Sequence, residues 1–204
     1  MATNAYMYFQ TYKPDYLASE SQADLTRLTS STLTKPFIDA GVGHIFEIED
    51  YSFDIEQTLN IGSQSSGAGA GKITFNPFSI TRKVDRASPV LFDMACSGTA
   101  FQTVGLALTR STGGGGSAPP IQLALTFTFK LVAIKTMAFA DAPEMAKETI
   151  AFEYGGLQVH YSQQSAAGAP GPVVVGGWNR VHNVIDHDVQ PIGGGLVRAP
   201  SLAP

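Results

Sequence analysis

The alternation of apolar and polar residues changes phase at fixed points along the chain, and this constrains the fold more than any other pattern. The alternation over residues 46–48 is out of phase with that over 51–55, so an extra residue near Glu49 must be absorbed as a bend or bulge. Further changes of phase fall at Pro77 and at the glycine pair 155–156. Long strands that bend at fixed points are what a small barrel requires at its corners. The sequence therefore predicts a mainly β protein, a small antiparallel β-barrel of bent strands.

The clearest single strand is predicted over residues 121–131, where the two faces alternate strictly. One face is large and apolar, whereas the other consists of Gln122, Ala124, Thr126, Thr128 and Lys130. A fully solvated face usually carries more lysine and glutamate than this. Two interpretations follow from the sequence: the threonine-rich face lines a lumen or a partner subunit, or it is an ordinary strand face in contact with water.

One packed α-helix is predicted to begin at Ser88, whose hydroxyl can accept from free backbone N–H groups, with Pro89 at the first helical position. Gly98 can end this helix in a left-handed conformation. We expect it to pack on the barrel through four positions at helical spacing: Val90, Leu91, Met94 and Ala95. Residues 23–28 are expected to form a further turn or two of helix.

Composition excludes several classes of function. With 204 residues, 44% of them hydrophobic and 15% charged, we expect one globular domain. The net charge of −4 and the lack of a basic cluster argue against nucleic acid as a partner. No apolar stretch approaches the roughly 20 residues needed for membrane insertion. The N-terminus lacks the basic and apolar regions of a cleaved signal peptide.

The motifs that would indicate an enzyme or a cofactor fail on inspection. Residues 67–72 are glycine-rich, but a phosphate loop needs Gly at position 66 and Ser or Thr at 73, where the chain has Ser66 and Ile73. His182, Asp186, His187 and Asp188 match no metal-binding spacing, and no serine lies in a G-x-S-x-G elbow. Cys96 is the only cysteine and is expected to be a buried thiol. We predict no catalytic residues, no cofactor and no metal.

The glycine-rich stretch between residues 62 and 71 cannot stabilise itself locally, because glycine loses the most conformational entropy on ordering. This extended arm is therefore either a loose surface loop or a segment held by a partner.

Five short motifs carry a resemblance to a known family. They are Tyr51-Ser52-Phe53 on a strand, residues 69–73 at the return of the arm, 84–89 at the helix start, 94–97 at the helix end, and Gly177-Trp178-Asn179 near the C-terminus. In this order they resemble the haemolysin-coregulated protein (Hcp) family, the inner-tube component of bacterial type VI secretion systems. The resemblance spans nearly the whole chain.

The resemblance implies a homohexameric ring whose copies stack into a tube, with a contractile sheath, a spike protein and effector cargo as partners. The subunit would be cytoplasmic before firing and would then reach the exterior or a target cell without a cleaved signal peptide. The arm residues implied in ring contacts and stacking are Gln57, Asn60, Gly62, Gly67, Gly69, Gly71 and Lys72. Trp178 and Asn179 would pack the C-terminal strand onto the barrel.

We expect a single Hcp-like barrel domain over residues 1–183, followed by a proline- and glycine-rich tail over 184–204. Residues 13–43 form a longer connection than the family usually has after its first strand. Two alternatives stay open. One is a tube protein of a related phage-like contractile injection particle. The other is a monomeric β-sandwich that binds carbohydrate, with Trp178 as a stacking platform.

Overall fold

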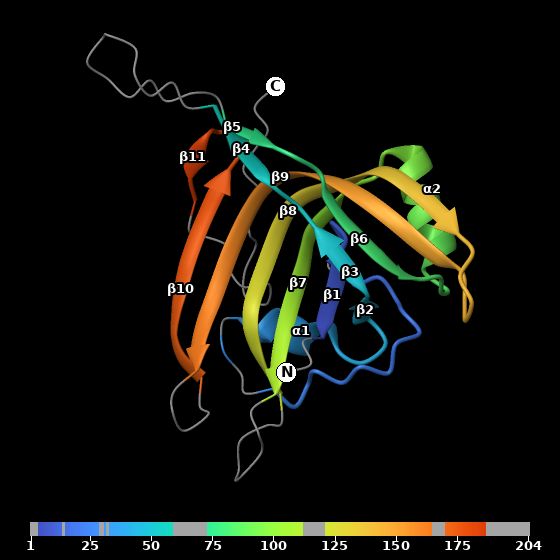
Figure 1. The fold of residues 1–204 in the computed structure, drawn as a ribbon, viewed down its shortest axis with the longest axis horizontal. Helices are drawn as coiled ribbons and strands as arrows, with labels where there is room; N and C mark the ends of the chain where they lie inside the picture. Colours follow the sequence, from blue (N-terminus) through green and yellow to red (C-terminus); the bar gives the residue numbers. More distant parts are fainter. Residues whose placement is uncertain are drawn as a thin grey trace.

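The computed structural model describes residues 4–13, 15–28, 31, 33–58, 73–111, 121–164 and 170–186. Its main sheet has nine strands in antiparallel pairs, and the predicted mainly antiparallel β architecture is thereby confirmed (Figure 1). The strands are β1 (Ala5–Gln10), β2 (Phe46–Ile48), β3 (Asp50–Ser52), β6 (Phe78–Lys83), β7 (Phe101–Ser111), β8 (Ile121–Ala140), β9 (Lys147–Gln164), β10 (Pro170–Asn179) and β11 (Val184–Ile185). A separate two-stranded ribbon consists of β4 (Ile55–Gln57) and β5 (Ile73–Phe75), and the helices are α1 (Lys35–Ala40) and α2 (Ser88–Ser97).

The strand pairings return on themselves around the core. β1 pairs with β7, β7 with β8, β8 with β9, β9 with β6 and β6 with β3, while β2 pairs back with β1. Glu49 is the residue between β2 and β3, and its N–H donates to the Thr81 carbonyl at 2.9 Å. The predicted bend near Glu49 is therefore confirmed: it is the seam at which one stretch of chain changes partner from β1 to β6.

The other two changes of phase also coincide with bends. Pro77 lies between β5 and β6, where the chain leaves the ribbon for the main sheet. The third lies inside the continuous strand β9, where Gly155 faces Leu131 of β8. Leu131 has a φ of 50°, a left-handed conformation uncommon for a leucine. A Cβ on Gly155 would lie 3.2 Å from the Leu131 side chain, so a larger residue at this position would require that side chain to shift.

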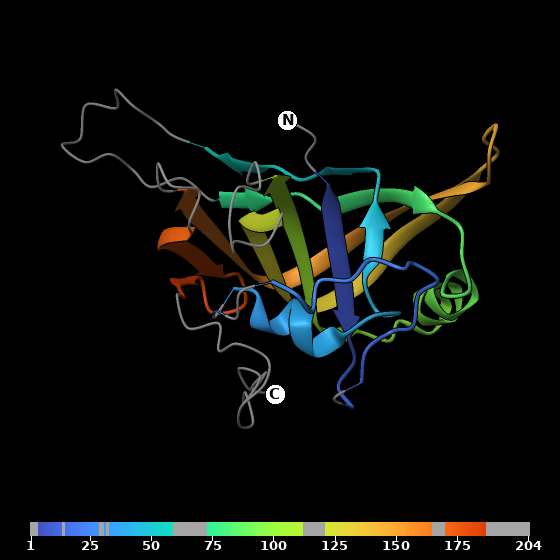
Figure 2. The same cartoon turned by 90° about the horizontal axis from the view of Figure 1, so that it is seen from below.

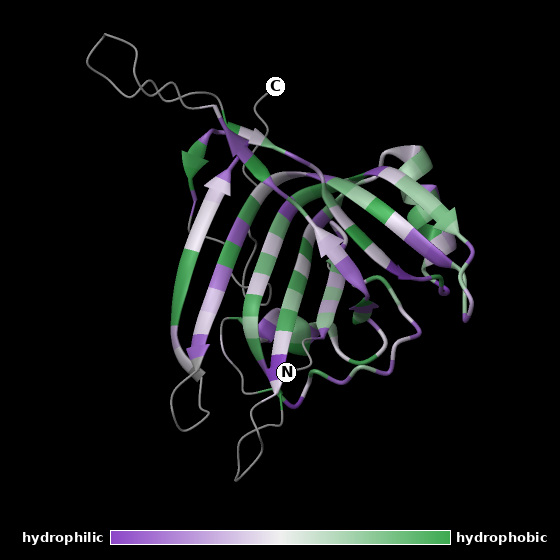
Figure 3. Cartoon of the chain, in the orientation of Figure 1, coloured by the Kyte–Doolittle hydropathy of each residue, from purple (hydrophilic) through white to green (hydrophobic). Residues whose placement is uncertain are grey.

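The inner face of the sheet encloses an aromatic core. Figure 3 shows the alternation of hydrophobic and hydrophilic residues along β7, β8 and β9 that directs one set of side chains inward. Phe78 and Phe129 stack with their ring centroids 4.3 Å apart, and Phe152 lies beside Phe78 at 6.0 Å. Leu91 and Met94 of α2 contribute to the same core. Each such buried side chain stabilises the fold by about 1.5–3 kcal/mol.

The long connection after β1 builds a second core on the opposite face of the sheet. Figure 2 shows α1 lying against β1 and β7. Tyr8 is its centre, in edge-to-face contact with Phe37 at 4.9 Å and with Tyr16 at 5.8 Å. A Cβ on Gly105 of β7 would overlap the Tyr8 ring. The connection is therefore a packed layer of the protein.

The second core covers part of the threonine-rich face of β8, at Thr126, while Thr128 and Lys130 stay half-buried. Thr126 pairs with Ala107, which belongs to the second core, and only 3% of Thr126 is exposed. The pairing of β8 with β7 slips by one residue at Ala124, so Leu123 joins the second core whereas Phe127 and Phe129 lie in the first. The strict alternation predicted over residues 121–131 is therefore wrong beyond this bulge, and Gln122 lies on the other face of β8 from Thr126.

The predicted helix begins at Ser88 and ends before Gly98, whose φ of 67° confirms the left-handed end. The predicted cap is wrong in detail. The N-cap residue is Ala87 and Pro89 is the second helical residue. The Ser88 hydroxyl instead accepts from the N–H of Asp85 at 3.1 Å and from Arg82 Nη2 at 3.2 Å.

Three further expectations about helices fail. Val90 is exposed, because it lies on the flank of α2 and not on the inward side that carries Leu91 and Met94. Cys96 is exposed and not buried, because it lies on the side of α2 away from the core. Residues 23–28 form no helix, and the short helix of this connection is α1, with Pro36 in its first turn.

A buried ion pair joins β6 to β9 beneath the start of α2. Arg82 and Glu148 face each other across the two strands, with Arg82 Nη2 2.6 Å from Glu148 Oε1, and both side chains are almost fully buried. The same Arg82 nitrogen lies 2.9 Å from Asp85 Oδ1, and the guanidinium stacks on the Phe46 ring at 4.9 Å. Arg82 thus links the sheet, the core and the turn before α2.

We predict that Arg82→Met lowers the free energy of unfolding by about 3–5 kcal/mol, because it leaves the Glu148 carboxylate buried without a counter-charge. The matched control is Lys83→Met on the same strand, whose partner Glu144 is exposed, and this variant should unfold almost like the unsubstituted protein. Urea denaturation of all three proteins measures the effect. An equal loss of unfolding free energy in both variants would contradict the stabilising role of the buried Arg82–Glu148 ion pair.

Candidate assembly surface at the arm base

The ribbon of β4 and β5 is the described part of the glycine-rich arm, and we call it the arm base. It pairs Ile55 with Phe75 and Gln57 with Ile73, apart from the main sheet. Its stem is closed where Asn76 Nδ2 donates to Asp54 Oδ2 at 2.6 Å. Of the predicted arm residues, Gln57 lies in β4; the others lie outside the described residues: Asn60, Gly62, Gly67, Gly69, Gly71 and Lys72.

The Gly-Trp-Asn motif lies at the end of β10, and each residue has a local reason to be there. A Cβ on Gly177 would overlap the carbonyl oxygen of Asp186, because the chain after β11 passes directly over it. The Asp186 N–H donates to the Gly177 carbonyl at 3.2 Å, and Gln158 Nε2 donates to the Asp186 carbonyl at 3.0 Å. The glycine therefore allows the end of the sheet to fold back on itself.

Trp178 and Asn179 complete this element. Trp178 is half-buried and pairs with Leu157 of β9 on one side and with Ile185 of β11 on the other. Asn179 is buried, and its Oδ1 accepts from the N–H groups of Val181 and His182, both at 3.1 Å. The asparagine side chain thus holds the turn that follows β10.

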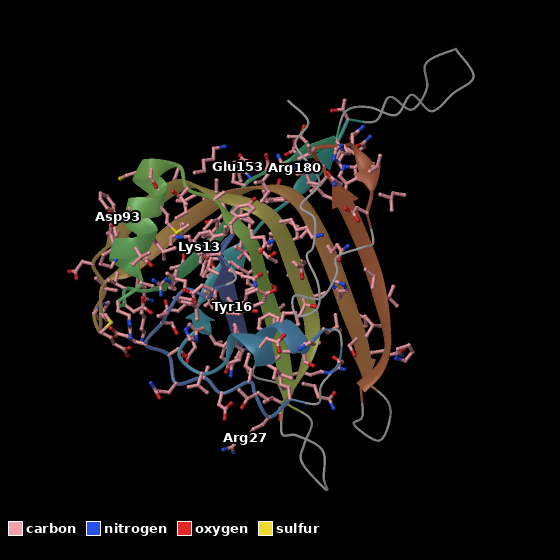
Figure 4. All side chains as sticks on the ribbon, turned by 180° about the vertical axis from the view of Figure 1, so that it is seen from behind. Lys13, Tyr16, Arg27, Asp93, Glu153 and Arg180 are labelled. Atoms are coloured by element: carbon pink, nitrogen blue, oxygen red, sulfur yellow. The ribbon has the colours of Figure 1, made fainter. Side chains whose placement is uncertain are left out.

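Arg180, the next residue, clamps the arm base to the sheet (Figure 4). Its Nη1 donates to the Tyr154 carbonyl at 2.6 Å and to Glu153 Oε2 at 3.3 Å, and its Nη2 donates to the Phe75 carbonyl at 3.5 Å. The guanidinium also lies over the rings of Tyr154 at 4.6 Å and Phe75 at 5.2 Å. Arg180 was not predicted as a site residue from the sequence, although its place directly after the Gly-Trp-Asn motif is a signal.

The charges around Arg180 suit this role. Burial raises the pKa of Glu153, but hydrogen bonds from Lys135 at 2.9 Å and from Arg180 outweigh it and lower the pKa. Burial raises the pKa of Tyr154 to about 12, against the opposing charge of Arg180. At neutral pH the guanidinium therefore faces one ionised carboxylate and two neutral rings.

Beside the arm base, β10 and β11 form an exposed apolar surface that we call the open edge. Among the described residues, β10 pairs with β9 on one side, whereas β11 covers only Trp178 and Asn179 on the other. The open edge carries Val174 and Ile185, each 68% exposed, and Tyr161 of β9, which pairs with Val174. Unpaired backbone groups next to exposed apolar side chains favour the addition of another strand.

The opposite end of the molecule carries a second exposed apolar surface, which we call the helix end. Figure 1 shows α2 on the far side of the sheet from β10 and β11. Exposed at the helix end are Val90 and Phe92 of α2, Phe139 of β8 and Met145 of the turn between β8 and β9. One subunit thus has two apolar surfaces that face in different directions.

Two observations bear on other kinds of site. In the described ranges, no group of three or more His, Cys, Asp and Glu side chains could hold a metal ion. His187 and Asp188 of the HNVIDHD segment lie outside those ranges. No helix in the part of the chain that the structure describes is long and apolar enough to cross a membrane.

Comparisons with known proteins agree with this geometry. The model of one protein family, described as "Type VI secretion system effector, Hcp", matches residues 38–161. A solved structure described as a type six secretion system protein superposes with a TM-score of 0.68 at 20% identity, covering 91% of this chain and 100% of its own. Hcp1 from Salmonella typhimurium superposes with a TM-score of 0.63 at 16% sequence identity, also covering 91% of this chain and 100% of its own. Hcp1 from the E. coli EAEC 042 pathovar superposes with a TM-score of 0.62 at 11% sequence identity, covering 88% of this chain and 99% of its own. No curated protein matches the chain.

We predict that Gly177→Ala detaches β11 and lowers the free energy of unfolding by about 1–3 kcal/mol, because the added Cβ meets the Asp186 carbonyl and lies 2.8 Å from Gln158 Cγ. Gly176→Ala is the matched control, since no atom lies within 4 Å of its Cβ position. Urea denaturation and hydrogen exchange over residues 178–186 measure both effects. Protection that is lost equally in the two variants would refute the role of Gly177.

Proposed function

Because the chain belongs to the Hcp family of type VI secretion system effectors, we propose that its copies close into hexameric rings that stack into the inner tube of that system. The observation that supports ring formation is the pair of apolar surfaces at opposite ends of one subunit. A contact between two different surfaces repeats from copy to copy. It produces a closed ring when the rotation that relates neighbouring subunits divides a full turn into a whole number of steps. We propose that the open edge of one subunit contacts the helix end of its neighbour.

The open edge supports this arrangement in a second way. Val174 and Ile185 are too exposed to stabilise an isolated subunit, and the free side of β10 presents N–H and C=O groups without a strand partner in the described chain. Burial against a neighbour would remove both features from water. In the ring, a neighbouring subunit would cover the apolar side chains and the backbone groups that the open edge exposes in a single subunit.

The arm has the second assembly role in this proposal. Its base forms a ribbon apart from the main sheet, and we assign the segment between the two strands of this ribbon to contacts with a neighbouring subunit or the next ring. We assign ring contacts and stacking to the predicted arm residues, from Gln57 to Lys72. Around the finished tube we place a contractile sheath, at its tip a spike protein, and in its lumen effector cargo.

The subunit would act by assembly and delivery, without catalysis and without a cofactor. It would be made in the cytoplasm and leave the cell through the secretion machine itself. Membership in the type VI family favours this system over a phage-like injection particle. The carbohydrate-binding alternative has less support, because Trp178 lies between Leu157 and Ile185 and its Nε1 is buried.

We predict that the purified protein has the native mass of a hexamer and appears as open rings in negative-stain images, because the two apolar surfaces are covered only in a ring. Native mass spectrometry and light scattering across a range of concentrations test this. A strict monomer at every concentration would contradict the proposed function and would favour a monomeric binding module.

We predict that deletion of Ser63–Ala70 leaves the barrel folded but weakens ring formation or stacking, because the shortened arm no longer reaches a neighbour. Circular dichroism tests folding, and native mass with tube length in electron micrographs tests assembly. A control that shortens a different glycine-rich segment, deletion of Gly113–Gly116, should assemble normally. Unaltered rings and tubes from the Ser63–Ala70 deletion would refute the role of the arm.

A further inference from the structure

The arm base is joined to the rest of the molecule by few described contacts. Its two strands pair with each other and not with the main sheet. The Phe75 ring meets the Tyr154 ring edge to face at 6.4 Å, and the Phe75 carbonyl accepts from Arg180. A three-pair ribbon is not stable in isolation, so the direction in which it leaves the sheet depends on contacts of this kind.

Arg180 is itself held firmly. Its N–H donates to the Gly155 carbonyl at 2.8 Å, at the bend of β9. The turn it belongs to is fixed by Asn179 Oδ1, and the Val181 side chain lies against Gly155, only 3.3 Å from where a Cβ would be. The backbone of Arg180 is therefore anchored to β9 before its side chain makes any contact.

The side chain then connects three separate parts of the fold. It reaches Glu153 and the Tyr154 carbonyl on β9, and the Phe75 carbonyl on β5, while its own backbone follows β10. Only a planar guanidinium can donate in several directions and stack on two rings at once. A lysine could keep the charge contact with Glu153 but not the whole set.

We propose that Arg180 is the positioning residue of the arm: it fixes the direction in which the arm base leaves the sheet by joining β5 to the bend of β9. This inference rests on the proposed function, because an arm held in one direction meets the next ring in one register. An arm that is already oriented loses less conformational entropy on contact. Arg180 thus deepens the assembly role of the arm by naming the residue that orients it.

The test measures the direction of the arm base directly. Spin labels are placed at Glu56→Cys in β4 and Asp93→Cys in α2, both exposed, in a Cys96→Ser background, and the labelled chain is diluted with excess unlabelled protein. Electron paramagnetic resonance gives the distance distribution between the labels. We expect Arg180→Met to replace a narrow distribution with a broad one. An unchanged narrow distribution would overturn the proposal.

Two further variants separate positioning from general loss of structure. Lys135→Met is the matched control, because it removes the other cation on Glu153 without touching Phe75, and it should leave the distribution narrow. Arg180→Lys should give a distance distribution of intermediate width. If Arg180→Met does not fold, this variant decides the test: an Arg180→Lys distribution as narrow as that of the unsubstituted protein overturns the proposal.

The same samples distinguish this inference from the proposed function. If the unsubstituted protein forms no rings but Arg180→Met still broadens the distribution, the proposed function fails and the role of Arg180 stands. If rings form and stack, we expect Arg180→Met rings to form shorter tubes than Lys135→Met rings. Tubes of equal length from these two variants would overturn the assembly consequence of the clamp.

Discussion

The change of strand partner at Glu49 is the constraint on which the rest of the structure depends. A single stretch of chain pairs first with β1 and then with β6, and the circuit of hydrogen bonds returns on itself at this point. At the seam itself the Glu49 N–H donates to the Thr81 carbonyl of β6. The aromatic core needs this closure, because a flat sheet would leave one side of Phe78 and Phe129 in water.

The closed seam between β2 and β3 contrasts with the free side of β10. With the β2–β3 seam closed, the side of β10 away from β9 is left largely without a partner in the described chain, and it carries the exposed Val174. The helix end carries a second group of exposed apolar side chains. Two apolar surfaces at opposite ends of a subunit are suited to a contact that repeats from copy to copy.

Several local features could be predicted from sequence because their physics is local. Strand side chains alternate, so a break in the alternation located the bends at Glu49, Pro77 and Gly155. Gly98 could be recognised as the end of α2 because few other residues adopt its left-handed conformation. The cap at Ser88 was predicted wrongly because the Ser88 hydroxyl accepts from Arg82 and from the backbone N–H of Asp85. These donors lie before the helix, so the helical pattern alone could not reveal them.

By itself, the sequence determined the β architecture, the positions of its bends, the resemblance to a family and the presence of a glycine-rich arm. Only the tertiary structure decided which faces are covered and which residues meet. Thr126 is buried because the second core forms over its neighbour Ala107, and Cys96 is exposed because α2 turns it away from the core. Arg180 meets Phe75 although 105 positions separate them in the chain. Alternation and capping depend on neighbours along the chain, whereas burial and clamping depend on residues that folding brings together.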